Sequence, residues 1–459
     1  MTAGVSGGHE VGDRRPWLPL MALTTVSVVS MDSLAVPIAL DQSGTGAQVS
    51  LALLEWTLIA YSLAFAALVP AACTLYAAHG SRRMLCLGQA MLAAASVGCA
   101  LAPVGPWLVL GRTAQGAAAA LVVPAVLKRA GRISSPRISG LVLPGCAGGV
   151  IELSAAAGPL VCAAVAESED WRWIFWLNVP VCLLSLVLAA VWDEDRRHVP
   201  RRPDLEGALI AGLGSFALAW GVTEGASQGW GNAVVLLGLV LGAGLLLVSF
   251  FGRRPLGGFR TTEFLATRVG YACGCAGLYC MVLLLQRYFL ATDPAGRPLE
   301  VWLHLAPLCL GLLVCAPLSD PLALRVGTSR LMALGLVTTA VALGALAWGA
   351  HQGAPYDRLL LPLLLSGSGI ALALPAGRTL ALVVPAKSVP GGGPASVGAL
   401  RNLGGAFGVA AVGAVLTYRA SGSAPHAPNG LAPAIALVGL ICLAGAATYF
   451  AVPSRRSPI

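Results

Sequence analysis

Long apolar segments separated by short polar ones run through nearly the whole chain. A helix of about 20 apolar residues is long enough to cross the hydrocarbon core of a bilayer. The chain is therefore predicted to be an all-α polytopic membrane protein. We predict fourteen transmembrane helices, at about 17–40, 53–77, 84–103, 106–129, 138–166, 171–192, 206–226, 232–252, 265–290, 301–320, 330–349, 358–384, 395–418 and 431–452.

Basic residues mark one side of the predicted spans. Most of the 29 Lys and Arg residues lie in the two tails and in alternate loops, such as "SRR" (81–83) and "DEDRRHVPRR" (193–202). The opposite loops, such as "DQSGTGAQVS" (41–50), carry almost none. Because Lys and Arg are retained on the cytoplasmic side, both termini are predicted to be cytoplasmic. The net charge of +9 follows from this bias and needs no nucleic-acid partner.

The composition agrees with a membrane protein and argues against an enzyme. Hydrophobic residues make up 57% of the chain and charged residues 11%, which is more apolar surface than one soluble core can bury. The 12 cysteines lie in apolar stretches and the 6 histidines are dispersed, so no metal site is predicted. No phosphate-binding loop is present and no loop is long enough for a nucleotide-binding domain. Without a cofactor, the energy for any transport would come from an ion gradient.

Two short sequences recur in the second half of the chain. "GSRRMLCLG" (80–88) is echoed by "GTSRLMALG" (327–335), and "GAAAALVVP" (116–124) by "GSGIALALP" (367–375). Parallel halves around a central site are common in secondary transporters. The repeats predict two halves of six helices, with two further helices inserted between them.

Six segments in order along the chain resemble the major facilitator superfamily, and within it the fourteen-span drug:proton antiporter branch. They are "MDSLAVPIAL" (31–40), "EWTLIAYSLAFAALVPA" (55–71), "GRTAQGAAAALVVPA" (111–125), "AAAGPL" (155–160), "WRWIFWLNVPV" (171–181) and "RNLGGAFGVAAVGAVL" (401–416). The resemblance implies the major facilitator fold. The corresponding parts are a cytoplasmic N-tail (1–16), a six-helix half (17–192), a linker with inserted helices (193–264), a second six-helix half (265–452) and a cytoplasmic C-tail (453–459).

The resemblance also implies a cytoplasmic gate at the turn after the second span, with the pattern G-x-L-a-D-R-x-G-R-R. The matching residues are Gly80, Arg82 and Arg83 in the first copy and Arg325, Gly327 and Arg330 in the second. Ala77 and Leu324 stand where the family has an acid. The charge lock at the gate is therefore predicted to be weaker than in relatives.

Ionisable residues inside spans are costly and are candidates for function. Asp32 in the first span and Arg112 in the fourth lie at similar depths from the outer ends, so an ion pair between them is predicted. Burial favours the neutral acid and a nearby arginine favours the carboxylate, and these opposing influences allow Asp32 to bind and release a proton. The resemblance implies proton handling for both residues, and the alternative is that Asp32 only neutralises Arg112.

Three other positions in the fourth and fifth spans carry predictions. Glu152 lies in the middle of a span, where an acid facing a cavity suits a proton or a cation, or else bonds to a neighbouring helix. Gly158 and Pro159 predict a kink in the fifth span, because proline removes a backbone hydrogen bond. Gln115 and Gly116 predict a similar feature in the fourth.

The leading hypothesis is a monomeric, proton-coupled exporter of lipophilic or amphipathic small molecules, including antibiotics, in the bacterial inner membrane. Its predicted partners are protons, a small-molecule substrate and the lipid bilayer. Two alternatives stay open: an exporter of another class of metabolite, and a transport-inactive relative that acts as a sensor or assembly partner.

Overall fold

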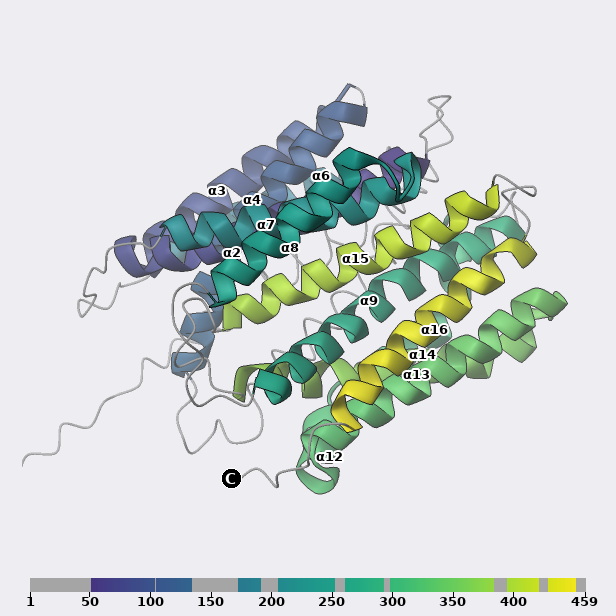
Figure 1. Ribbon diagram of the computed structural model, residues 1–459. Helices are drawn as coiled ribbons and strands as arrows, with labels where there is room; N and C mark the ends of the chain where they lie inside the picture. The colour runs from purple at the N-terminus through teal and green to yellow at the C-terminus, as the bar shows by residue number, and fades with distance from the viewer. Residues whose placement is uncertain are drawn as a thin grey trace, which may run out of the picture.

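A computed structural model describes residues 51–103, 105–133, 172–190, 205–251, 261–292, 298–383, 394–420 and 428–450. The described segments are helices joined by short turns, and they contain no strand (Figure 1). The helices of the first part are α2 (Leu51–His79), α3 (Ser81–Ala100), α4 (Gly105–Ile133), α6 (Trp173–Ala190), α7 (Leu205–Gln228) and α8 (Ala233–Phe251). Those of the second part are α9 (Thr261–Thr292), α10 (Pro298–His304), α11 (Ala306–Cys315), α12 (Ser319–Val326), α13 (Thr328–Gln352), α14 (Tyr356–Val383), α15 (Pro394–Ala420) and α16 (Pro428–Phe450).

Each predicted span within these residues coincides with helix, but one of them is broken. The segment 301–320, predicted as a single span, is divided among α10, α11 and α12, with a bend of 58° between the last two. Pro317 lies at this bend and has no backbone N–H to continue the helical ladder. Spans 17–40 and 138–166 lie outside the described residues, so the total of fourteen stays a prediction.

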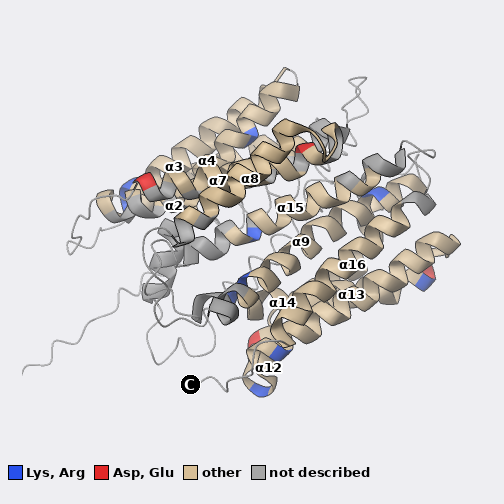
Figure 2. Cartoon of the chain, viewed as in Figure 1, with Lys and Arg blue, Asp and Glu red and all other residues tan. Residues whose placement is uncertain are grey.

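Length and composition mark several described helices as able to cross a bilayer. Five of them meet this test, or six if α11 and α12 form one broken span. Large apolar side chains are exposed on the outer surfaces, for example Val240 on α8 at 67% and Val341 on α13 at 66%. Charged side chains are sparse along the helices (Figure 2). Such surfaces suit contact with lipid, because lipid tails do not penalise exposed apolar groups.

The helices form two bundles that meet along α2 and α15. In the first, α4 packs on α2 and α3, and α3 packs on α6. In the second, α9 packs on α15 and α16, and α13 packs on α14 and α16 (Figure 1). The inserted helix α7 packs on α8, α2 and α15, so it contacts both bundles. The domain boundaries predicted from the sequence stay predictions.

The two copies of the glycine turn have the same backbone conformation. Gly80, between α2 and α3, has φ 89° and ψ 162°. Gly327, between α12 and α13, has φ 95° and ψ 137°. A positive φ is readily adopted only by glycine, which explains why both repeats begin with this residue.

The other repeated glycines occupy equivalent helix contacts. A Cβ at Gly116 of α4 would collide with the backbone carbonyl of Tyr61 in α2, and one at Gly367 of α14 would collide with that of Leu308 in α11. The last glycines of the first repeat also correspond: Gly88 meets Ala118 and Val122, and Gly335 meets Gly369 and Ala373. Ala118 lies two residues after Gly116, as Gly369 does after Gly367. Val122 and Ala373 each lie six residues after the same two glycines. The sequence repeat is therefore also a repeat of packing.

A candidate proton-coupling site around Arg112

Arg112 lies in the third turn of α4 and is fully buried, with an exposed fraction of 0%. Its Nε donates to the backbone carbonyl of Thr57 in α2 over 3.3 Å, and its Nη1 donates to Gln115 Oε1 over 2.9 Å. The guanidinium carbon lies 4.5 Å from the centre of the Tyr61 ring, in a cation–π contact. A buried arginine needs such partners, because the loss of hydration is otherwise too costly.

Gln115 connects this arginine to a third helix. Its Nε2 donates to Ser96 Oγ of α3 over 2.8 Å, and the Cys99 thiol lies 3.6 Å from Gln115 Oε1. The side chains of Gln115, Ser96 and Cys99 are all 0% exposed. The network thus spans α2, α3 and α4. Ser96 and Cys99 were not singled out from the sequence, because serine and cysteine are ordinary residues in an apolar helix.

Gly116 determines how closely α4 approaches α2. Since a Cβ at this position would collide with the Tyr61 carbonyl, glycine is what allows the contact. The close approach brings Arg112, one helical turn earlier, within reach of Thr57 and the Tyr61 ring. Helix α4 continues through Gln115 and Gly116 without a break. Within the described residues, their visible roles are hydrogen bonding and close packing.

The second bundle has apolar residues at most of the equivalent positions. The repeated glycine contacts align Arg112 with Leu363, Ser96 with Leu343 and Cys99 with Leu346. All three leucines belong to one buried apolar cluster. Gln115 aligns with Ser366, whose hydroxyl bonds to the carbonyl of Leu363 in its own helix over 2.8 Å. The fold therefore packs well without a charge at these positions. Packing alone does not explain the Arg112 network.

Four predicted site residues lie outside the described part of the chain. They are Asp32, Glu152, Gly158 and Pro159. The pairing of Asp32 with Arg112, the role of Glu152 and the kink at Gly158 and Pro159 stay predictions.

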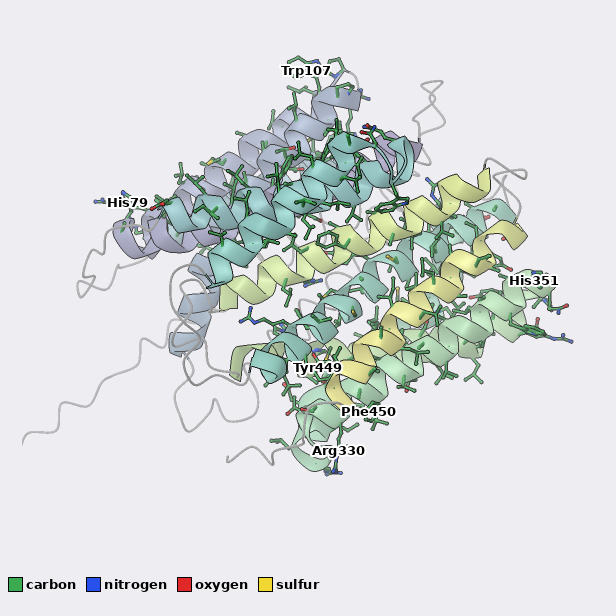
Figure 3. The ribbon with its side chains drawn as sticks, viewed as in Figure 1. His79, Trp107, Arg330, His351, Tyr449 and Phe450 are labelled. Carbon is green, nitrogen blue, oxygen red and sulfur yellow. The ribbon has the colours of Figure 1, made fainter. Side chains whose placement is uncertain are left out.

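The gate residues lie where the sequence places them, at the ends of helices. Arg83, Arg325 and Arg330 are exposed, and Arg82 is half-buried. His79, at the end of α2, and Arg330, in the first turn of α13, extend outward from their bundles in Figure 3.

The second gate copy has an acid one helical turn away from the expected position. Leu324 is 52% exposed and carries no charge, as the sequence indicated. Asp320, four residues earlier in α12, is half-buried and interacts electrostatically with Arg378 of α14. Leu324 therefore leaves the family's acid position uncharged in this copy, and the weaker charge lock stays a prediction. Residues four apart share a helix face, which is the signal that the sequence contained.

No group of three or more His, Cys, Asp or Glu side chains within the described residues could hold a metal ion. The cysteines within the described residues form no disulfide bonds.

The fold and the buried polar network define a class of protein: a transporter built from two similar helical halves. The sequence profile of the Major Facilitator Superfamily matches residues 20–409, and the chain belongs to this family. It is accordingly a multi-pass membrane transporter and not an enzyme.

Several relatives are named for drug resistance or export. The puromycin resistance protein pur8 of Streptomyces alboniger is 31% identical over 469 residues, covering 96% of this chain and 92% of the relative. The tetracenomycin C resistance and export protein of Streptomyces glaucescens is 29% identical over 423 residues, covering 88% and 77%.

Solved structures share the fold at low sequence identity. The xylose transporter XylE from E. coli, in a partially occluded inward open conformation, matches with a TM-score of 0.65 and 14% identity, covering 97% of this chain and 100% of that chain. The peptide transporter POT matches with a TM-score of 0.68 and 16% identity, covering 95% and 93%.

Proposed function

We propose that this protein exports lipophilic or amphipathic small molecules, antibiotics among them, in exchange for protons. It works by alternating access as a monomer in the bacterial inner membrane, with both termini in the cytoplasm. The relatives named for puromycin and tetracenomycin resistance support the substrate class. The proton coupling rests chiefly on one observation: a fully buried arginine network in the first bundle where the second has mostly leucine.

The network suits an arginine whose partner carboxylate is alternately charged and protonated. In the proposed cycle, the Asp32 carboxylate pairs with Arg112 and loses its charge when it binds a proton from outside. The guanidinium then keeps its bonds to the Thr57 carbonyl and the Gln115 amide oxygen. Dipoles fixed in advance by the fold can hold the charge without reorganising, which keeps both protonation states accessible.

The gate belongs to the same proposal. Arg82, Arg83, Arg325 and Arg330 lie at helix ends on the proposed cytoplasmic side, beside the two glycine turns. With Ala77 in the first copy and the acid displaced to Asp320 in the second, closure of this side depends less on the gate's charges than in relatives.

The experiment uses purified protein in vesicles with an imposed pH gradient. We expect Asp32→Asn to lose gradient-driven accumulation of puromycin or of a lipophilic cationic dye. Exchange of labelled for unlabelled substrate should remain, because exchange needs no net proton movement. Asp357→Asn is the control, since Asp357 is an exposed acid in the first turn of α14. Accumulation at the parent rate in Asp32→Asn would contradict coupling through this residue. A parent protein that neither accumulates nor exchanges any member of a substrate panel would contradict export itself.

A further inference from the structure

Gln286 of α9 is a buried amide with an unsatisfied acceptor. Its side chain is 1% exposed, and its Oε1 has no hydrogen-bond partner in the described structure. The residues one turn away along the helix are apolar: Val282, Leu283, Phe289 and Leu290. An amide oxygen removed from water without a donor destabilises a fold, and a leucine of similar size would avoid that penalty.

The contacts of α9 show which side of the helix Gln286 occupies. Gly270 faces Tyr449 of α16, and Gly274 faces Leu374 of α14. The Tyr279 ring lies against Gly405 of α15. Gln286 follows Tyr279 by seven residues, which is two helical turns, so both side chains are on the α15 side.

This side of α9 packs on the helix that contacts the first bundle. Helix α15 is the element of the second bundle that packs on α2, α4 and α7. Ile59 and Leu63 of α2 belong to the same buried cluster as Tyr279 and the apolar neighbours of Gln286. In transporters built from two such halves, the substrate path runs between them.

From this placement we infer that Gln286 is a substrate-recognition residue. Its Oε1 accepts a hydrogen bond from an N–H or O–H group of an amphipathic substrate whose apolar part contacts the surrounding side chains. The inference rests on the proposed export function and narrows its substrate class to amphipathic molecules that carry a donor, such as a primary ammonium or a hydroxyl.

The test compares two cationic dyes that share one aromatic body. One carries a primary ammonium group and the other a trimethylammonium group, so that they have equal charge but differ in N–H donors. We expect Gln286→Leu to weaken binding of the ammonium dye about tenfold, the effect of one buried hydrogen bond, while binding of the trimethylammonium dye is unchanged. The melting temperature of the ligand-free variant should stay the same or rise, because an unsatisfied group has been removed.

Gln89→Leu is the matched control. Gln89 of α3 is also 1% exposed, but it makes polar interactions within the protein. This variant should lower the melting temperature and change the binding affinity of both dyes to the same extent. The role of Gln286 would be overturned if Gln286→Leu weakened the binding of both dyes equally. A fall in melting temperature like that of the control would also overturn it. If the parent protein exports both dyes in that case, the proposed function stands and only this inference fails. If the parent protein binds and exports neither dye, the proposed function fails as well.

Discussion

Replacing Ser96 with alanine tests whether α3 positions the buried arginine. In the structure, Gln115 Nε2 donates to Ser96 Oγ over 2.8 Å, and all atoms of both side chains are shielded from solvent. Ser96→Ala leaves the Gln115 amide without this acceptor, and no water can replace it in a packed helix interface. The cost of such an orphaned group is about 1–3 kcal/mol.

Part of that cost should affect transport, because Gln115 also accepts from Arg112 over 2.9 Å. If the amide turns to find another acceptor, Arg112 loses one of its fixed partners. We expect the rate of gradient-driven export to fall about fivefold to tenfold, since about 1.4 kcal/mol corresponds to tenfold. The assay is initial uptake into inside-out vesicles over a series of pH values, with unfolding followed separately by thermal denaturation.

Thr339→Ala is the matched control in the other bundle. Thr339 of α13 is fully buried, and its hydroxyl donates to backbone carbonyls of Gly335 over 2.9 Å and Ser366 over 3.5 Å. It lies at the α13–α14 contact, the counterpart of the α3–α4 contact, but far from the arginine in the sequence and in the other bundle. We expect this control to change thermal stability modestly and to leave the pH profile of export unchanged.

A double-mutant cycle tests directly whether Ser96 acts through Gln115. If Ser96 acts through Gln115, then Ser96→Ala should add little in a Gln115→Leu background, with a coupling energy of about 1 kcal/mol or more. Additive effects of the two substitutions would show that Ser96 supports stability without positioning the arginine.

Two further substitutions test the packing and the gate. Gly116→Ala should destabilise the protein by about 1–3 kcal/mol in thermal denaturation, because its Cβ would collide with the Tyr61 carbonyl, while Gly98→Ala, in open space on α3, should be neutral or stabilising. Asp320→Asn removes the charge that interacts electrostatically with Arg378. It should raise cysteine labelling of the cavity from the cytoplasmic side by about twofold to fivefold, because interactions between partly exposed charges are weak.

Each of these two expectations has its own contradicting outcome. Equal melting temperatures for Gly116→Ala and Gly98→Ala would mean that α4 and α2 can separate at no cost. Unchanged labelling in Asp320→Asn would mean that other contacts close the cytoplasmic side.

The bundles are alike in packing and unlike in chemistry at their centres. The same glycine contacts hold α4 on α2 and α14 on α11, yet Arg112 in one bundle corresponds to Leu363 in the other. Buried polar and charged atoms inside a membrane protein destabilise it unless they are paired, so a buried arginine is a candidate for function. This asymmetry is consistent with the proposed handling of protons in the first bundle.

The sequence predicted the repeat, the family and the helices of the described residues, apart from the break within 301–320. A helix that crosses a bilayer must be apolar over a fixed length, so its presence can be read from composition along the chain. The glycine turns at Gly80 and Gly327 were predictable because few other residues tolerate a positive φ. Arg112 was conspicuous because an arginine within an apolar run is expensive and therefore rare.

Which side chains meet became visible only in the folded chain. Helices that are apolar on all sides carry no periodic signal for the face that packs inward, so Ser96, Cys99 and Gln286 looked like ordinary residues. Their surroundings depend on helix contacts, such as those of Gly88 with α4 and of Gly405 with the Tyr279 ring. The broken helix at Pro317 and the electrostatic interaction of Asp320 with Arg378 were also missed, because hydropathy measures how apolar a segment is and not its direction in space.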